Sequence, residues 1–240
     1  MAGTAEHIVK SYEQELRHLR DLIARMGGMV ESQLALATRA IVDADGDAAA
    51  QSVDQDPAVD ALEREVEAFV IRLLALRQPV ANDLREVVAA LKITAALERI
   101  GDYAANVAKR ALVLARFRPP SGTAALATLS RLVQENLRVV VDAVGERDAD
   151  KAVQVWRSDR EIDELYTAIF RELITSMTED PRSITACTHL LFIAKNLERI
   201  GDHATNIAEN VHYAVTGEAL TESRPKGDAS PAYAPVRPHD

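Results

Sequence analysis

The 240-residue chain has little cysteine and few aromatic residues, and each shortage excludes a class of protein. Cys187 is the single cysteine, so no disulfide can form within the chain, and we expect this residue to be a small buried apolar side chain. Aromatic residues make up 4% of the chain, whereas Ala, Leu, Glu and Arg are frequent. This composition favours helices over strands.

Membrane-spanning and export signals are also missing from the sequence. No run of about 18 apolar residues occurs, which is the minimum for a transmembrane helix. The first residues lack the basic start and apolar core of a signal peptide. We therefore expect a cytoplasmic protein without direct membrane insertion.

Acidic residues outnumber basic ones, so the formal net charge is −9 and the isoelectric point is about 5.2. Such a field repels phosphate backbones, so we expect no nucleic-acid partner. The sequence contains no Walker loop, dinucleotide-binding glycine pattern, nucleophile elbow or zinc signature. It therefore offers no catalytic motif, and we expect a protein that is not an enzyme.

Apolar residues recur at spacings of three and four along nearly the whole chain, which predicts long helices. Pro57 is expected to kink or restart the second helix, and Asp180 with Pro181 is expected to open a new one. The best linker is the Pro-rich stretch at 117–122, and the tail is predicted to be disordered. The expected helices cover about 16–41, 47–77, 84–114, 123–145, 148–177 and 182–214, in domains 1–117 and 118–217, with a tail at 218–240.

One sequence motif, called the repeated phrase below, occurs twice in the chain. LERIGDYAANVA at 97–108 and LERIGDHATNIA at 197–208 share nine of twelve residues. A second internal similarity relates Asp56 and Asp60 to Asp159 and Asp163, which lie 103 residues later in the chain. The chain is therefore predicted to be all-α, with two tandem antiparallel three-helix bundles related by an internal pseudo-twofold repeat.

Each repeat carries pairs of acidic residues one helical turn apart, separate from the apolar stripe of the same helix. Such like-charged pairs repel by a few tenths of a kcal/mol, which a bound cation would reverse. If the two acidic helices of a repeat face one groove, four carboxylates converge, and oxygen ligands suit hard cations, iron or manganese. The predicted metal ligands are Asp56, Asp60, Glu98 and Asp102 in the first repeat and Asp159, Asp163, Glu198 and Asp202 in the second.

Other interpretations of these acids stay open. They could be a solvated surface on a structural scaffold, or part of a carboxylate-bridged metalloenzyme. The latter needs Glu-x-x-His, where this chain has Gly101 and Gly201. A glycine inside a helix costs roughly 1 kcal/mol, so we expect another backbone, or a bound ion with its waters, to approach there. His203 is either an extra ligand or a partly exposed helical histidine, while Arg99 and Arg199 are expected to be surface or ion-paired charges.

Four segments of the chain resemble the PhoU family: the two LERIGD copies with their flanks, GGMVESQL at 27–34 and QPVANDLR at 78–85. The resemblance covers about 7–217. It implies a tandem three-helix-bundle protein without known catalysis, expected to form a homodimer. It further implies a negative regulator of the phosphate-starvation response that links the ATPase of the phosphate ABC transporter to a sensor histidine kinase. Metal ions on the acidic motifs, such as Mg, Mn, Fe or Zn, are also implied, without fixing which metal.

Overall fold

The structure, a computed structural model, describes the backbone of residues 2–117 and 123–220 and the side chains of 12–117 and 124–220. Within these ranges the chain is helical and contains no strand. The elements are α1 (Ala2–Val42), α2 (Gly46–Arg77), α3 (Ala81–Leu114), α4 (Thr123–Glu146), α5 (Ala149–Glu179), a 3₁₀ turn at Pro181–Ser183 and α6 (Ile184–Thr216).

The helices begin and end close to where the sequence places them. Asp45 caps α2, because its side chain accepts a hydrogen bond from the Ala48 amide at 2.9 Å. Pro57 does not restart the helix, since α2 runs unbroken through it. Asp180 caps the 3₁₀ turn with Pro181 at its first position, as predicted. Most of the expected linker lies outside the described residues. The expected tail does so from residue 221 onward.

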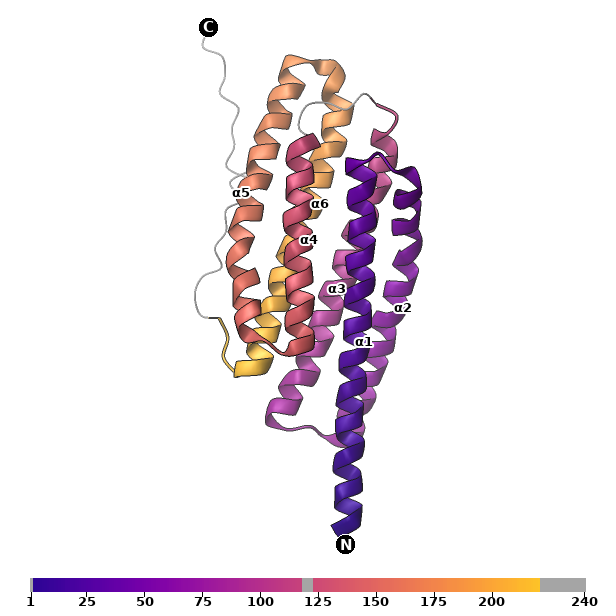
Figure 1. The fold of residues 1–240 in the computed structure, drawn as a ribbon, viewed down its shortest axis with the longest axis vertical. Helices are drawn as coiled ribbons and strands as arrows, with labels where there is room; N and C mark the ends of the chain where they lie inside the picture. Colours follow the sequence, from indigo (N-terminus) through magenta and orange to yellow (C-terminus); the bar gives the residue numbers. More distant parts are fainter. Residues whose placement is uncertain (1, 118–122, 221–240) are drawn as a thin grey trace.

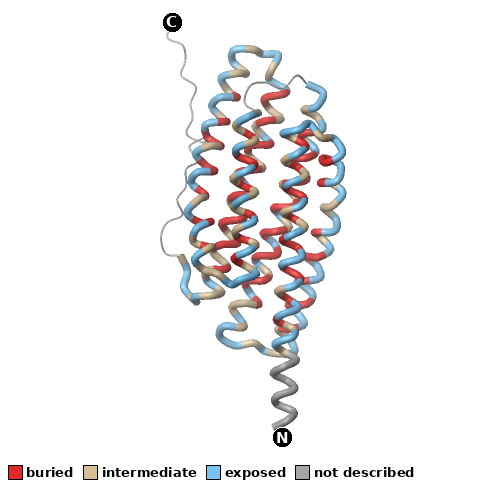
Figure 2. The backbone as a smooth tube through the Cα atoms, in the orientation of Figure 1, coloured by how far each residue is buried: buried red, intermediate tan, exposed pale blue. Residues whose placement is uncertain are grey.

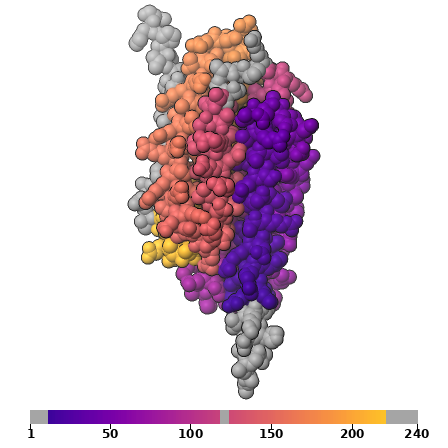
Figure 3. All heavy atoms as spheres, viewed as in Figure 1, coloured from indigo at the N-terminus to yellow at the C-terminus, as the bar shows by residue number. Residues whose placement is uncertain are grey.

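The helices form two bundles that lie side by side (Figure 1). α1, α2 and α3 pack against one another in the first bundle, and α4, α5 and α6 do so in the second. α3 packs along α6 and α1 packs along α4, so four helices join the bundles. Figure 3 shows α1 and α4 meeting along much of one face of the molecule. The predicted all-α fold of two three-helix bundles is confirmed.

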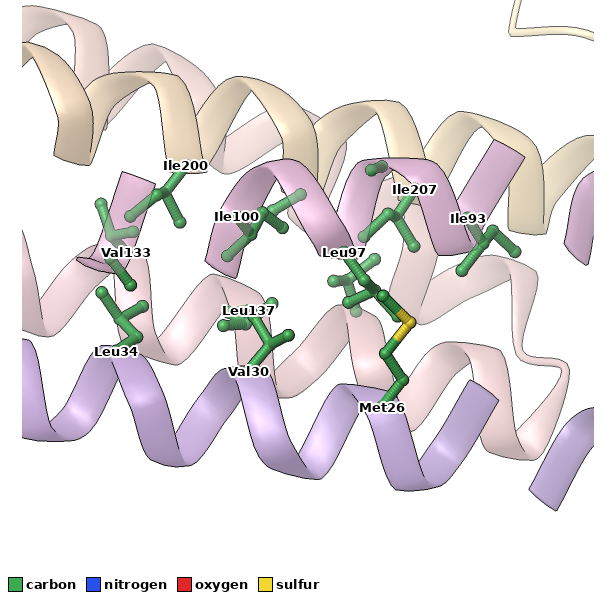
Figure 4. Close-up of a cluster of buried hydrophobic side chains, with 14 of the residues drawn as sticks. Met26, Val30, Leu34, Ile93, Leu97, Ile100, Val133, Leu137, Ile200 and Ile207 are labelled. Carbon is green, nitrogen blue, oxygen red and sulfur yellow. The ribbon is translucent and has the colours of Figure 1, made fainter. Parts of the chain in front are cut away.

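A single apolar core runs through both bundles. Buried residues recur along each of the six long helices, where Figure 2 shows them alternating with exposed ones. In Figure 4, apolar side chains from α1, α3, α4 and α6 point into one cluster. Each fully buried Leu, Ile or Val stabilises the fold by roughly 1.5–3 kcal/mol. The labelled members are Met26, Val30, Leu34, Ile93, Leu97, Ile100, Val133, Leu137, Ile200 and Ile207.

None of the helices in the described ranges is apolar enough over a sufficient length to cross a bilayer. Cys187 is fully buried, as the sequence predicts.

Gly27 lies where α1 packs closely against α4. A Cβ placed there would lie 2.7 Å from Cγ1 and 3.1 Å from Cγ2 of Val141, whereas a Cβ on Gly28 would meet nothing within 4 Å. Val141 is β-branched and stiff, so it yields only if its helix moves. The contact between the bundles therefore requires a glycine at 27 but not at 28.

We expect Gly27→Ala to be less stable than Gly28→Ala by about 2 kcal/mol, because only the first overpacks the α1–α4 contact. Both variants gain the same helix propensity over glycine, about 1 kcal/mol, so that term cancels. Urea unfolding followed by circular dichroism measures the difference. Equal midpoints for the two variants would contradict the packing that we describe.

Candidate functional site

The four acids predicted in the first repeat lie where α2 packs against α3. We call Asp56 and Asp60 of α2 with Glu98 and Asp102 of α3 the first acidic site. All four are partly exposed. Because the turn between α2 and α3 is short, the two helices run antiparallel, and their acidic pairs lie near one another where the helices pack.

Charge repulsion shows that the acids of the two helices are near one another. The pKa of Asp102 is raised, first by burial and then by the charges of Asp56 and Asp60, while Arg99 acts in the opposite direction. The pKa of Glu98 is raised by burial and by Asp102. The two carboxyl groups of α3, Glu98 and Asp102, are therefore harder to ionise, and a bound cation would relieve this.

Gln33 of α1 reaches into the first acidic site from the core. Its Nε2 donates to the Ser52 carbonyl at 3.0 Å and to Oδ1 of Asp56 at 3.2 Å. Its Oε1 is buried and accepts no hydrogen bond within the described residues. A Cβ on Gly101 would lie 3.0 Å from that oxygen. A side chain, and not the backbone that was one of the two expected neighbours, therefore lies closest to Gly101; the other expectation, a bound ion with its waters, stays a prediction.

Two further charged residues lie close to the first acidic site. Glu63, one turn beyond Asp60 on α2, is close enough to Glu98 to raise its pKa. Arg99 lies 3.5 Å from Oε2 of Glu98 and 3.5 Å from Oδ2 of Asp102, at the long end of an ion pair. Arg99 is therefore an ion-paired surface residue, and it offsets only part of the negative charge.

The corresponding acids of the second repeat, between α5 and α6, are more deeply buried. We call Asp159, Asp163, Glu198 and Asp202 the second acidic site. Asp159, Asp163 and Glu198 are 1%, 4% and 4% exposed, and only Asp202 is partly open. These three acids are therefore buried between the helices, which the sequence pattern did not predict. Residues of α5 and α6 close over them, which hydropathy alone does not indicate.

Lys195 supplies a positive charge inside the second acidic site. Its Nζ lies 2.8 Å from Oε1 of Glu198 and 4.9 Å from the centre of the Tyr166 ring. The other oxygen of Glu198, Oε2, is buried and has no hydrogen-bond partner within the described residues. Burial raises the pKa of Glu198 to about 7, despite the lowering effect of Lys195.

Asp159 is held by a hydroxyl group. Thr205 Oγ1 donates to Oδ1 of Asp159 at 3.1 Å and also contacts the Gly201 carbonyl at 3.1 Å. A Cβ on Gly201 would lie 3.1 Å from Cδ1 of Ile162 and 3.8 Å from Asp159. As at Gly101, side chains of the neighbouring helix occupy the space that the glycine leaves.

The residues that follow the two Asp of the repeated phrase meet between the sites. The rings of Tyr103 and His203 lie 5.7 Å apart at 35°, across the α3–α6 packing. Arg199 donates to the Tyr103 hydroxyl at 3.1 Å, and the charges of Glu198 and Asp202 also act on its guanidinium. The predicted role of His203 as an extra ligand stays a prediction, and the described contact is with Tyr103.

The first acidic site fits a hard cation better than the second. It offers carboxylates that repel one another and the unpartnered Oε1 of Gln33, all of them oxygen ligands. The second already contains the Lys195 ammonium. In neither site, nor elsewhere among the described side chains, do three His, Cys, Asp or Glu groups lie close enough together to hold a metal ion as they stand.

Comparison with known proteins identifies the family. The PhoU domain matches residues 23–111 and again 126–211, one match for each bundle. The chain belongs to the PhoU family. The two PhoU domains contain the first and second acidic sites, respectively, so the repeated phrase is a repeated PhoU motif.

Relatives and solved PhoU structures agree along most of the chain. A protein of Caulobacter vibrioides, named as a phosphate-specific transport system accessory protein PhoU homolog, is 54% identical over 224 residues, covering 93% of this chain and 97% of its own. The crystal structure of PhoU from Pseudomonas aeruginosa has a TM-score of 0.85 at 39% identity, covering 86% of this chain and 100% of its own. That of the phosphate transport system regulatory protein PhoU from Streptococcus pneumoniae has a TM-score of 0.81 at 30% identity, covering 88% and 100%.

Sequence reasoning found the acids but missed the polar residues that distinguish the two sites. Gln33 carries a visible signal, since it is a polar residue on the apolar stripe of α1 between Val30 and Leu34. Lys195 carries a visible signal too, because it lies three residues before Glu198 on the same helix, a spacing at which two side chains are neighbours. Glu63 and Thr205 lie three residues after Asp60 and Asp202, so the sequence places them near acids of their own helix. Only the packing of neighbouring helices brings them to Glu98 and Asp159.

Because the pKa of Glu198 is raised, we expect its contribution to the stability of the fold to depend on pH. Between the ordinary value of 4.5 and about 7, the native protein holds a proton that the unfolded chain has released. The contribution of Glu198 to stability is therefore fully present below pH 4.5 and is lost as the pH rises to about 7. We expect Glu198→Gln to gain about 2 kcal/mol relative to the parent protein between pH 5 and pH 8.

Urea unfolding at several pH values, in a chelator, measures this difference. Glu164→Gln is the matched control, because Glu164 lies exposed on α5 beside Arg160. A stability difference for Glu198→Gln that stays flat with pH would contradict a raised pKa at this carboxyl.

Proposed function

We propose that this PhoU-family protein is a cytoplasmic negative regulator of the phosphate-starvation response. It acts as an adaptor between the ATPase of the phosphate ABC transporter and a sensor histidine kinase. The observation that carries the proposal is the agreement along nearly the whole chain with proteins named as accessory or regulatory to phosphate transport. When phosphate is plentiful, docking of the helical surfaces holds the kinase in its inactive state.

The acidic sites give the adaptor its metal-binding character. Carboxylates on paired helices, with the Gln33 amide hydrogen-bonded to one of them, are a donor set for Mg, Mn, Fe or Zn held through oxygen. A bound divalent or ferric ion would supply positive charge that ties α2 to α3. The protein's own residues bind and orient that ion, and the proposal includes no catalytic step.

The adaptor acts as a homodimer in this proposal. α3 exposes an apolar stripe before its acids begin, with Leu84 41% and Val88 36% exposed. Such a stripe on a helix otherwise packed in a bundle is typical of a protein contact surface.

Deletion of the gene tests the regulatory role. We expect a deletion strain to express its starvation-induced phosphatase in high phosphate, because the kinase is no longer restrained. A plasmid copy of the parent gene should restore repression. Phosphatase activity of cells grown in high and low phosphate is the measurement, and normal repression in the deletion strain would refute the regulatory role.

Metal analysis of protein purified without chelator tests the proposed metal binding. We expect stoichiometric metal in the parent protein and its loss in the Asp56→Asn/Asp102→Asn double variant, because two carboxylates of the first acidic site become neutral. Glu135→Gln is the control, since Glu135 is exposed on α4 and pairs with Arg131. Absence of stoichiometric metal from the parent protein would favour a structural scaffold, and redox turnover by the loaded protein would favour a metalloenzyme.

A further inference from the structure

A mostly apolar pocket lies where the two bundles meet, near the C-terminal ends of α4 and α6. It has a volume of about 50 Å³ and takes residues from α1, α3, α4 and α6, but none from the two acidic sites. Because a water molecule takes about 10–15 Å³ on this measure, the pocket accepts roughly four water-sized groups, about the size of a branched butyl group. Its apolar wall includes Leu19, Ile23, Ala90, Ile93, Val144 and Val211.

Three charged residues, Arg20, Glu86 and Arg147, line the same pocket. Nε of Arg20 lies 2.6 Å from Oε1 of Glu86, and Nη1 of Arg147 lies 2.8 Å from Oε2 of Glu86. The two arginine side chains are 36% and 42% exposed, so they lie on the solvent side of the apolar wall. Two guanidinium groups thus share one carboxylate, and Asp83 acts more weakly on Arg20.

The guanidinium groups of Arg20 and Arg147 keep donors for a second anion. A guanidinium has several N–H donors, and the contact with Glu86 uses one nitrogen of each arginine. Neither arginine makes another hydrogen bond to the side chains or backbone that the structure describes. A carboxylate suits such donors, because its two oxygens match the planar fork of a guanidinium.

Arg147 is positioned by a strained turn. Its φ is 56°, just after the end of α4, in the left-handed region that a residue with a Cβ rarely adopts. Ala44 has a φ of 52° at the equivalent position, 103 residues earlier, so the repeat supplies the backbone conformation without the guanidinium. Ala186 lies 100 residues after Glu86, at its equivalent position. The ion pair of Arg147 with Glu86 is therefore not a feature of the repeat.

We propose that this pocket binds a small branched-chain carboxylate, with the apolar group between the helices and the carboxylate on Arg20 and Arg147. The combination of an apolar wall with cationic groups on its solvent side carries the proposal. A free fatty acid and an amino acid both have this chemistry, and they differ in an ammonium group that Glu86 would accept. The site is independent of metal binding and of the regulatory role proposed above.

Four small molecules test the chemistry of the ligand. Isovalerate is titrated into the purified full-length chain, and saturation-transfer difference NMR detects binding at its methyl groups. Acetate lacks the apolar group, and isoamyl alcohol keeps that group without the charge, so these two are matched controls. L-valine adds only an ammonium group to isovalerate, and it therefore distinguishes an amino acid from a free fatty acid.

Three variants test the place of binding. Arg147→Ala removes one guanidinium, and Ala44 shows that alanine adopts the same backbone conformation. Ala214→Leu adds a larger apolar side chain at the pocket wall, where it takes the space of the ligand. Arg131→Ala is the control, because Arg131 is exposed on α4 and does not line the pocket. Circular dichroism confirms that each variant is folded.

We expect the parent protein and Arg131→Ala to bind isovalerate with a dissociation constant in the millimolar range, as suits so small a ligand. Arg147→Ala should weaken binding by roughly tenfold, because a charge-assisted hydrogen bond is lost. Ala214→Leu should abolish binding, and Arg147→Ala keeps the test decisive if that variant fails to fold. Acetate should not bind, and isoamyl alcohol should bind roughly tenfold more weakly than isovalerate.

Three results would overturn the proposal. The first is an absence of saturation transfer to both isovalerate and L-valine from the folded parent protein. The second is equal binding by the parent protein, Arg147→Ala and Ala214→Leu, because the ligand would then lie elsewhere. The third is equal binding of isoamyl alcohol and isovalerate, because the guanidinium groups would then have no part in it. Tighter binding of L-valine than of isovalerate supports the site and assigns an amino acid to it, and the reverse order assigns a fatty acid.

Discussion

The packing of α3 along α6 is the contact on which the rest of the structure depends. Both helices bury alanines completely, among them Ala104 and Ala108 in α3 and Ala204 and Ala208 in α6. Small side chains let two helices lie close together, and larger ones such as Ile100 and Ile200 then fill the core shared with α1 and α4. Because these two helices also carry the acids of the repeated phrase, their packing fixes which way both acidic stripes face.

The acids are tolerated because each site offsets its repulsion differently. In the first, the carboxyl groups remain partly exposed and their repulsion is offset by Arg99 and by the Gln33 amide. In the second, burial is deeper, and Lys195 and Thr205 hold individual carboxylates directly. A buried carboxylate without such partners would cost several kcal/mol. The duplicated motif has thus been kept in sequence while its surroundings have changed.

Much of the fold could be predicted from the sequence. Periodicity predicted the helices, and the repeat predicted two equivalent bundles, because helical spacing and duplication are visible along one chain. The shared core was not predictable in this way, since apolar stripes show that a helix is buried and do not show by which neighbour. The expected restart at Pro57 was wrong, because its fixed φ suits a helix and the neighbouring turns of α2 maintain the helix across the missing amide; the expected kink stays a prediction.

The sequence by itself determined the fold class and the family, and it identified the eight acidic residues of the repeats. All three depend on the order and spacing of residues within single helices. Only the tertiary structure decided that Asp159, Asp163 and Glu198 are buried, that Gln33 enters the first site from α1, and that Tyr103 meets His203 between the sites. Burial and cross-helix contacts depend on the rotation and depth at which one helix packs on another. Those quantities arise from the summed packing of all six helices, and no single helix encodes them.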